Sequence, residues 1–299
     1  MLKIRKKIYW TWRKFLLRFF PCRAVDRDWK KWKGYPVDWK RPRDLNEKIQ
    51  WLMFRGDTSL WTLCADKYRV REYVSSKGLG DILVPLLGVW KKAEDVDFES
   101  LPEKFAIKCN HDSGSTHIVD KSAPGYDPEA IRKDLSKHLK VKYGYVHGEM
   151  FYNAIPPRII AEQLLEPSDG RASMTDYKIW CFGGKPYVIM TCAERTKDGF
   201  LIDVFDPGWN ERKDVCVYSA HYRRSETPLP RPESLERMLS AAEKLSEGFP
   251  EVRVDFYEEG GKLYFGELTF ASLCGKMTYF TDAFLRELGE QCILPGGKD

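Results

Sequence analysis

A glycine pair, Gly260-Gly261, lies in the stretch from Arg253 to Phe270, between two runs in which apolar and polar residues alternate. Alternation with a period of two is typical of β-strands, and a glycine pair supplies the positive φ angles that a tight turn requires. The stretch therefore predicts a β-hairpin. With the turn centred on the second glycine, Asp255 and Glu267 are expected to lie directly opposite each other.

Two facing carboxylates repel each other and destabilise a hairpin unless a cation lies between them. Asp255 and Glu267 would supply the hard oxygen ligands that Mg²⁺ prefers. Arg253 and Thr269 lie two residues from these acids, so the pattern predicts that all four side chains share one face. The alternative is an exposed hairpin whose acids are solvated, and the pattern alone leaves both interpretations open.

The chain of 299 residues is 43% hydrophobic and 14% aromatic, which is enough to bury a substantial core, and its length suggests about two lobes. Its net charge of +5 is unevenly distributed. Residues 1–43 contain 15 Lys and Arg against 3 Asp, a balance of +12, which leaves 34 basic and 41 acidic residues, a balance of −7, for the remainder. A positive stripe over the whole fold is therefore not indicated, and we expect no nucleic-acid partner.

The eight cysteines form no C-x-x-C pair and no zinc-type cluster, so we expect free thiols, as in a reducing cytoplasm. Charged residues interrupt every apolar run near the N-terminus, and the sequence therefore predicts no cleavable signal peptide. Both observations favour a cytoplasmic protein.

Residues 2–20 predict a basic amphipathic helix that ends at Pro21. Its apolar stripe consists of Ile4, Ile8, Trp12, Phe15 and Phe19. The basic residues lie mostly on the opposite side and are Lys3, Lys6, Lys7, Lys14 and Arg18. The segment is too short and too charged to span a bilayer, but it fits an in-plane helix on an anionic membrane, at the inner face of the plasma membrane. The alternative is a helix that docks on the body of this chain or on another subunit.

A strand at residues 105–110 presents Lys108 on one face and leads into a loop with three small residues, Ser113, Gly114 and Ser115. Small residues let backbone N–H groups and hydroxyls approach a polyphosphate closely, and Lys108 supplies a positive charge. The spacing is not that of a Walker loop. Taken alone, the Ser-Gly-Ser sequence favours a simple hairpin turn.

A second strand is predicted at residues 158–166. It begins with an apolar run and continues through Glu162, Gln163 and Leu165. An adenine slot needs this combination of backbone edges and aliphatic walls, and the carboxylate of Glu166 would reach a ribose hydroxyl. The same pattern serves any strand that leaves a protein core.

Other segments add context to these motifs. Residues 45–77 show helical periodicity, residues 176–195 predict a hairpin that presents Lys178, and residues 232–247 predict an amphipathic helix. The D-V-D at residues 95–97 is similar to a glycosyltransferase metal motif, but its acidic neighbours favour a surface loop.

The order of these elements resembles that of the ATP-grasp superfamily. More narrowly, the following phrases look like the TupA-like (teichuronopeptide biosynthesis) ATP-grasp family: L-N-E-K-I-Q-W-L, D-K-Y-R-V-R-E-Y-V, K-C-N-H-D-S-G, P-R-I-I-A-E, D-Y-K-I-W-C-F-G-G-K-P, G-F-P-E-V-R-V-D-F-Y and Y-F-G-E-L-T-F. They run from about Leu45 to Thr269. The resemblance implies an α+β fold of the ATP-grasp type, in which two α+β lobes with antiparallel sheets grip ATP between them, preceded by the basic amphipathic N-terminal helix.

The resemblance divides the chain into four parts. Residues 1–43 would form the basic N-terminal arm and residues 44–104 a lobe that precedes the ATP-grasp core. Residues 105–165 would form the small lobe, with the phosphate loop and the hinge. Residues 166–299 would form the large lobe, which carries the metal-binding hairpin.

The resemblance also implies roles for individual residues. Contacts with phosphate would come from Lys67, Lys108, Ser113, Gly114 and Ser115, and Lys178 would contact phosphate or adenine. The adenine would be lined by Glu162, Gln163 and Leu165, and Glu166 would contact the ribose. Asp255 and Glu267 would bind two Mg²⁺ ions, with Thr269 as a further ligand where the superfamily usually has Asn. Asp112 and Leu273-Cys274 depart from the glycine and the Pro-Gly-rich run that are usual at their positions.

By the same resemblance, the chain would be an ATP-dependent carboxylate–amine ligase that works through an acylphosphate. It would attach an amino acid or another amine to a uronic acid of a bacterial surface polysaccharide. Lys108 and Arg253 would stabilise the charge that develops during the reaction, and Arg195 would hold the substrate carboxylate. The alternatives are an ATP-grasp sugar or glycan kinase, a glycosyltransferase of capsule or exopolysaccharide biosynthesis, and a membrane-docking scaffold with an inactive nucleotide site.

Overall fold

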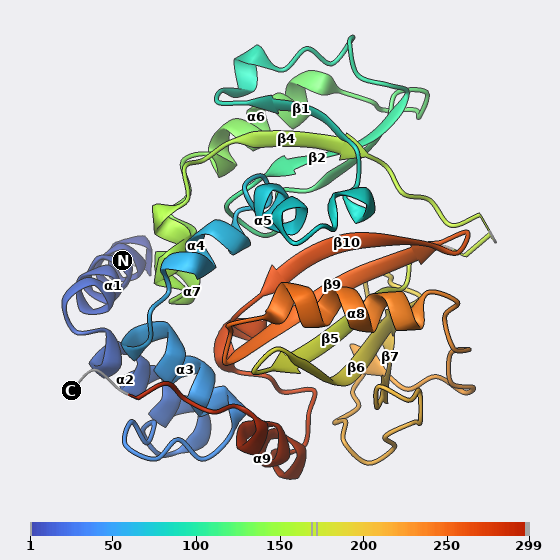
Figure 1. Ribbon diagram of the computed structural model, residues 1–299. Helices are drawn as coiled ribbons and strands as arrows, with labels where there is room; N and C mark the ends of the chain where they lie inside the picture. Colours follow the sequence, from blue (N-terminus) through green and yellow to red (C-terminus); the bar gives the residue numbers. More distant parts are fainter. Residues whose placement is uncertain (1, 169, 172, 297–299) are drawn as a thin grey trace.

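Two sheets, antiparallel except for one strand pair at the edge of the larger, lie one above the other in separate lobes, with short helices between them (Figure 1). The computed structural model describes residues 2–168, 170–171 and 173–296, and side chains from residue 9 onward. The side chains of Ile4, Ile8 and the three lysines before Tyr9 therefore lie outside the described part. Antiparallel sheets combined with helices confirm the predicted α+β class.

The first lobe contains a four-stranded sheet in the order β1-β4-β2-β3. Its strands are β1 (Leu86–Trp90), β2 (Lys104–Cys109), β3 (His117–Asp120) and β4 (Ile159–Gln163). Helix α6 (Pro128–His138) and the 3₁₀ segment η2 (Ala93–Asp95) pack on this sheet, whereas α7 (Tyr143–His147) and the 3₁₀ segment η3 (Met150–Ala154) pack against helices outside it. The predicted strands at residues 105–110 and 158–166 are thus confirmed as β2 and β4, which pair antiparallel with each other.

The second lobe contains a six-stranded sheet in the order β10-β9-β5-β6-β7-β8. Its strands are β5 (Asp176–Phe182), β6 (Lys185–Ala193), β7 (Phe200–Phe205), β8 (Tyr222–Arg223), β9 (Glu251–Glu259) and β10 (Lys262–Thr269). The remaining elements are α8 (Leu235–Ser246), η4 (Ser272–Gly275) and α9 (Asp282–Gln291). Both predicted hairpins are present, as β5–β6 and β9–β10.

The division of the chain at residues 43, 104 and 165 stays a prediction. Strand β1 precedes residue 104 and lies in the same sheet as β2, β3 and β4. Residues between Ala93 and Leu101 also share one hydrophobic core with the strands of that sheet.

In the β9–β10 hairpin, the predicted pairing of Asp255 with Glu267 depends on a β-bulge that was not predicted. Its turn contains only Gly260 and Gly261, both with positive φ, so Glu259 pairs with Lys262. That register alone would place Asp255 opposite Gly266. A β-bulge between Phe265 and Glu267 shifts the register by one residue, and Glu267 therefore faces Asp255.

Glycine is suited to the bulge at position 266 because the strands approach closely there. A Cβ atom at this position would lie 3.0 Å from the backbone oxygen of Asp255. Without the bulge, the side chain of Glu267 would point to the opposite face of the sheet, because side chains alternate along a strand. The bulge thus brings the two acids together.

Helix α8 covers the apolar face of the large sheet (Figure 1). The Cys181 thiol lies 3.9 Å from the backbone oxygen of Ala242, which identifies the covered face as that of Ile179 and Cys181. Lys178 alternates with these residues and therefore lies on the other face, together with Asp255, its partner across β5 and β9.

The helical periodicity over residues 45–77 belongs to three helices, α3 (Leu45–Arg55), α4 (Ser59–Ala65) and α5 (Val70–Ser76). The break after α4 has a local cause: the Asp66 carboxylate accepts hydrogen bonds from the backbone N–H groups of Tyr68 and Arg69. Such side-chain bonds compete with helical ones. Lys67 is therefore on a turn.

The N-terminal arm consists of α1 (Leu2–Phe19) and α2 (Pro21–Lys33). Helix α2 packs on the body through Val25 and the fully buried Trp29. Helix α1 buries Leu17 but leaves its aromatic stripe open, with Trp12, Phe15 and Phe19 exposed to 54%, 43% and 58%. The body of this chain thus covers α2 but not the stripe of α1. Within the described residues, no helix is long and apolar enough to cross a membrane.

Glu251, at the start of β9, is completely buried, and neither of its carboxylate oxygens has a hydrogen-bond partner among the described residues. Burial raises the pKa of Glu251 well above its usual value. The folded state therefore keeps a proton that the unfolded state releases above about pH 4.3. The stability contributed by the protonated form is lost as the pH rises toward the folded pKa.

We predict that Glu251→Gln, which mimics the protonated acid, removes this pH dependence. Relative to the wild type, the variant should gain at least about 1.4 kcal/mol of unfolding free energy between pH 5 and pH 8, the value of one pKa unit. Urea unfolding followed by tryptophan fluorescence measures the difference. The control is Glu236→Gln, which changes an exposed acid on α8 and should leave the pH dependence of the wild type unchanged. A pH-independent difference for Glu251→Gln would contradict the prediction.

Candidate functional site

The predicted metal carboxylates lie on three adjacent strands together with Lys178. Across β9 and β10, Asp255 pairs with Glu267, and across β9 and β5, Asp255 pairs with Lys178. Arg253 and Thr269 form the next pair of the hairpin on the same face. The predicted common face of these side chains is therefore present.

Asp255 is almost completely buried and bound by two cations. Arg253 donates from Nε to Oδ1 over 2.6 Å and from Nη2 to Oδ2 over 2.7 Å, and Lys178 Nζ donates to Oδ2 over 2.6 Å. Burial alone would raise the pKa of Asp255, but the two cations outweigh it and lower the pKa. The carboxylate is thus held in its ionised form.

Glu267 is more open, with its side chain 45% exposed. Its Oε1 accepts a hydrogen bond from Thr269 Oγ1 at 2.8 Å and another from Arg253 Nη2 at 3.2 Å. Arg253 also donates to Thr269 Oγ1 over 3.0 Å and to Ser272 Oγ over 3.0 Å. Arg253 therefore links both acids and fixes the Thr269 hydroxyl between them. Sequence reasoning did not single out Ser272.

The two carboxylates fit Mg²⁺ as a partial ligand set. Mg²⁺ is commonly bound through one or two carboxylates, with substrate phosphates and water as its other ligands. Asp255 and Glu267 supply such a pair on facing strands, with Glu267 as the more accessible oxygen donor. In the part of the chain that the structure describes, no group of three or more His, Cys, Asp or Glu could hold a metal by itself.

Two further lysines, Lys67 between α4 and α5 and Lys108 on β2, belong to the same charged region. Lys67 Nζ donates to the backbone oxygen of Asp112 over 2.6 Å. Burial lowers the pKa of Lys67, while the charge of Glu267 acts against that shift and the charge of Lys108 adds to it. Lys67 is therefore within electrostatic reach of both the large-lobe acid and the second lysine. Lys108 Nζ itself pairs with Glu162 Oε2 at 2.7 Å.

The phosphate loop predicted at residues 113–115 is held from within. Ser115 is buried, and its hydroxyl donates to Asp112 Oδ1 over 2.5 Å and accepts from the Cys109 N–H at 3.0 Å. The other oxygen of Asp112 lies 2.5 Å from His138 Nδ1, at the end of α6. Ser113 and Gly114 remain exposed at the tip. Asp112, where glycine is more usual, thus acts as the internal brace of the loop.

The residues predicted for adenine and ribose lie at the end of β4, which contains Glu162 and Gln163, and directly after it. Glu162 lies with the lysines, because it binds Lys108 and also Arg71, whose Nη1 is 3.4 Å from Oε1. Gln163 and Glu166 are exposed, and Leu165 is partly buried. Glu166 Oε1 pairs with Lys104 at 2.8 Å. Both acids of this group are therefore paired with lysines, Glu162 with Lys108 and Glu166 with Lys104.

Arg195, predicted to hold a substrate carboxylate, already binds an acid of the site. Its Nη2 lies 2.8 Å from Asp176 Oδ2, and its guanidinium stacks over Phe200 at 4.5 Å. Asp176 is also 3.3 Å from Lys178 Nζ, so it connects Arg195 to the Asp255 cluster. Sequence reasoning missed Asp176, although its position two residues before Lys178 places it on the same face.

The D-V-D motif does not join these acids. Asp97 accepts backbone hydrogen bonds from Glu99 at 3.1 Å and Ser100 at 3.4 Å, in an exposed turn. Asp95 is exposed in the same surface segment.

After β10, the chain turns through an unusual backbone segment. Leu273, Cys274 and Gly275 are consecutive left-handed residues, with φ of 47°, 57° and 65°. Two non-glycine residues in this region store roughly 1–3 kcal/mol of strain each. Gln50 Nε2 stabilises the segment by donating to the backbone oxygen of Cys274 over 2.6 Å. The departure from a Pro-Gly-rich sequence noted at Leu273-Cys274 thus coincides with a strained turn.

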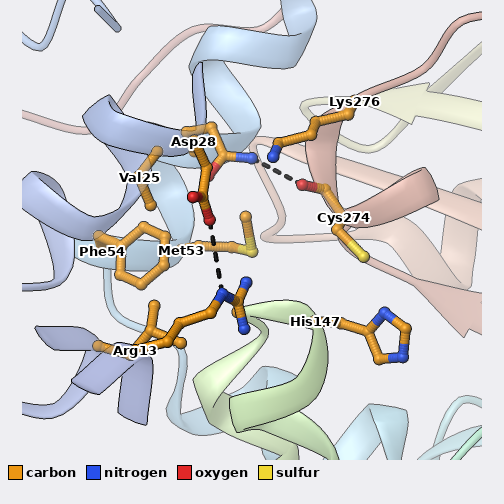
Figure 2. A pocket seen from close by; sticks show the side chains of 11 residues that line it. Arg13, Val25, Asp28, Met53, Phe54, His147, Cys274 and Lys276 are labelled. Carbon is orange, nitrogen blue, oxygen red and sulfur yellow. Dashed lines mark hydrogen bonds and ion pairs between the residues drawn. The ribbon is translucent and has the colours of Figure 1, made fainter. Parts of the chain in front are cut away.

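A cavity between the arm and the body borders this turn (Figure 2). Arg13 of α1 extends toward Asp28 of α2, with Nε 3.5 Å from Oδ2, while Cys274 and Lys276 approach from the other side. Arg13 also donates to the backbone oxygens of Tyr145 and Val146, which anchors α1 to α7. The residues lining the cavity are Arg13, Leu17, Val25, Asp28, Gln50, Met53, Phe54, His147, Gly148, Cys274 and Lys276. None of them is a residue predicted to bind ATP.

Comparison with known proteins identifies relatives of the chain. The family model described as TupA-like ATPgrasp matches residues 47–293. Comparison with curated protein sequences gives no match.

Several solved structures are similar to this one. For a D-alanine–D-alanine ligase from Bacillus anthracis complexed with ATP, the identity is 17%, over 70% of this chain and 54% of the ligase, with a TM-score of 0.39. For an L-amino acid ligase from Bacillus licheniformis, the identity is 15%, over 82% of this chain and 53% of the ligase, with a TM-score of 0.42. For a D-cycloserine synthetase, the identity is 15%, over 79% of this chain and 73% of the synthetase, with a TM-score of 0.43. The chain spans about half the length of the first two enzymes.

We predict that Asp112→Ala destabilises the loop at residues 113–116. The substitution leaves the buried Ser115 hydroxyl and the His138 ring without their acceptor, which should cost about 1–3 kcal/mol of unfolding free energy. Hydrogen exchange of the loop amides should accelerate. The control is Asp134→Ala, because the half-exposed Asp134 lies 3.1 Å from His117 and 3.8 Å from His138. Its loss should stay below about 1 kcal/mol. Equal losses for the two variants would contradict the role of Asp112.

Proposed function

The chain belongs to the TupA-like ATP-grasp family, and from this premise we propose that it is an ATP-dependent, ADP-forming carboxylate–amine ligase. Its acceptor would be a carboxylate-bearing sugar, a uronic acid of a bacterial surface polysaccharide, and its second substrate an amino acid or another amine. The observation that carries the proposal is the buried Asp255–Arg253–Lys178 cluster, with Glu267 beside it and Lys67 within electrostatic reach. Such an arrangement suits a polyphosphate with bound metal.

The proposed site divides ATP between the two lobes. Lys67, Lys108 and the exposed tip of the loop, Ser113 and Gly114, would orient the phosphates. Gln163 and Leu165 would line the adenine, and Glu166 would contact the ribose once it leaves Lys104. Mg²⁺, held by Asp255 and Glu267 with support from Thr269, would neutralise phosphate charge, and we propose two such ions.

In the proposed reaction, a carboxylate oxygen of the sugar attacks the γ-phosphorus of ATP and ADP leaves. The neutral amine then attacks the acyl carbon of the acylphosphate, phosphate leaves with the proton that the nitrogen loses, and an amide bond forms. Lys108, Lys178 and Arg253 would stabilise the negative charge on the transferring groups. Arg195 would orient the sugar carboxylate in exchange for Asp176, since guanidinium binds either carboxylate in a bidentate manner. The protein thus acts by positioning and by charge, without a covalent enzyme intermediate.

We predict that Glu267→Gln and Asp255→Asn each lower kcat at least about 100-fold, because they remove a proposed metal ligand. The assay supplies MgATP, glucuronic acid and a pool of amino acids, and mass spectrometry detects ADP and the amide. Glu259→Gln, near the turn of the same hairpin, should keep wild-type kinetics. ADP with a phosphosugar would indicate a glycan kinase instead. Binding of a UDP-sugar but not of ATP, with activity surviving Asp255→Asn, would contradict the ATP-grasp mechanism and favour the glycosyltransferase.

We further propose that the arm attaches the enzyme to an anionic membrane surface, at the inner face of the plasma membrane and close to a lipid-linked acceptor. The exposed aromatic stripe of α1 carries Trp12, Phe15 and Phe19, and Lys14 and Arg18 are exposed beside it. Aromatic residues on one side and basic residues on the other are typical of in-plane helices on anionic lipids.

We predict that replacing Trp12, Phe15 and Phe19 by Ser lowers co-sedimentation with phosphatidylserine vesicles by roughly tenfold or more. The variant lacks the three aromatic side chains that would insert into the lipid. The control replaces Tyr35 and Leu60, which are also exposed apolar residues, by Ser. Neutral phosphatidylcholine vesicles test the contribution of the basic residues. Equal binding by the stripe variant and the wild type would contradict the membrane proposal.

A further inference from the structure

Glu149 is a buried acid close to the proposed phosphate site, and none of the roles above uses it. It lies between α7 and η3 and is 6% exposed. The thiol of Cys274 donates a hydrogen bond to its Oε2 over 3.4 Å. In the described part of the chain, the carboxylate forms no ion pair. A buried carboxylate with a weak thiol donor and no paired cation is costly, because it lacks the charge that would compensate its desolvation.

The surrounding charges place Glu149 beside the active face of the large sheet. Burial raises the pKa of Glu149 to about 7, with a further rise from the charge of Glu267 and an opposing effect from Lys67. Glu267 is the accessible acid of the hairpin, and Lys67 is a proposed phosphate contact. Glu149 is therefore within electrostatic reach of the point where the two lobes would hold the phosphates.

Two tyrosines flank Glu149 along the chain, Tyr143 in α7 and Tyr152 in η3, and the Tyr152 N–H donates to the backbone oxygen of Glu149 over 3.1 Å. Tyr143 and Tyr152 pack edge to face, with their centroids 5.1 Å apart. Burial raises the pKa of both phenols, and the charge of Glu149 contributes to each shift. Tyrosine rings and a carboxylate within electrostatic reach of each other are both groups that attract an organic ammonium ion.

The position of the thiol is built by the strained turn after β10. Cys274 has a φ of 57°, and Gln50 holds its backbone oxygen. Strained conformations persist where the surrounding structure enforces them, and they cluster at functional sites. The turn thus brings the thiol to Glu149 immediately after the strand that carries Glu267 and Thr269.

We propose that Glu149, with Tyr143 and Tyr152, forms the subsite that binds the ammonium group of the amine substrate. This inference rests on the proposed ligase function and specifies where its second substrate enters. The ammonium group would supply the cation that Glu149 lacks. After it releases a proton to solvent, its nitrogen would lie as a neutral amine near the acylphosphate formed between the lobes. The subsite recognises a primary ammonium group and not a particular side chain.

Methylammonium chloride is the probe for this subsite, and thermal unfolding of the full chain is the measurement. A ligand in excess over its Kd stabilises the folded state, and we expect the wild-type Tm to rise by about 2 °C over an equal concentration of KCl. Glu149→Gln should abolish that rise, and the exposed control Glu236→Gln should retain it. An equal rise in Glu149→Gln and the wild type, or no rise in the wild type, would overturn the proposal.

A second pair of variants keeps the test valid should Glu149→Gln fail to fold. Tyr152→Phe preserves the aromatic ring and should keep the methylammonium effect, whereas Tyr152→Leu should lose most of it. Equal effects in these two variants would exclude a contribution of the ring.

A separate measurement distinguishes failure of the subsite from failure of the ligase function. Wild-type protein, MgATP, glucuronic acid and hydroxylamine should yield a hydroxamate if an acylphosphate forms, and methylammonium should slow that yield by occupying the same place. Hydroxamate formation that methylammonium does not affect would contradict the subsite and leave the ligase function intact. A methylammonium-dependent Tm shift without hydroxamate formation would support the subsite and count against the ligase function.

Discussion

The contact between Arg253 and Asp255, with Lys178 on the second carboxylate oxygen, is the interaction on which the large lobe depends. All three groups are buried on adjacent strands, and each would be costly to bury alone. Together they form short, charge-assisted hydrogen bonds, and removing one partner of such a cluster typically costs about 3–5 kcal/mol. The cluster is also asymmetric, because two cations surround one acid. That excess of positive charge is shared with Glu267, which explains why this more exposed acid stays next to the guanidinium.

Two of the three lysines that would meet a nucleotide are already paired with acids, and the third, Lys67, binds the backbone oxygen of Asp112. Lys108 binds Glu162, and Lys178 binds Asp255 and Asp176. A polyphosphate would therefore exchange partners with existing ion pairs instead of entering a site lined by free cations. Such exchange limits the affinity for the nucleotide, because the ion pairs must first be broken. The same ion pairs reduce the repulsion between several lysines at close range. Nucleotide binding would thus replace one set of ion pairs by another. The charges between the two lobes would be balanced both with and without the nucleotide.

The sequence allowed the hairpins, the strands that carry Lys108 and Glu162, and the family to be predicted, because period-two alternation and glycine pairs are local signals. It did not predict the helix break at Asp66, since that break depends on a side chain that competes with helical hydrogen bonds. The brace formed by Asp112, Ser115 and His138 joins a loop to a distant helix, and no spacing rule announces such a contact. Glu149 was also missed, because burial is what makes this acid unusual and no sequence pattern indicates that burial. The roles of the individual ATP-binding residues remain predictions.

The bulge at Gly266 decides whether the two proposed metal ligands, Asp255 and Glu267, lie on the same face of the sheet. The turn contains an even number of residues, and on that count the two acids would be on opposite sides of the sheet. The one extra residue in the bulge, Gly266, moves the side chain of Glu267 to the face of Asp255. The chemistry of this face therefore depends on a residue that has no side chain. Insertions or deletions of a single residue between Asp255 and Glu267 would reverse the facing of the second acid, whereas changes of two residues would preserve it. In a chain of this family, the length of the hairpin is therefore as informative about metal binding as the identity of the acids themselves.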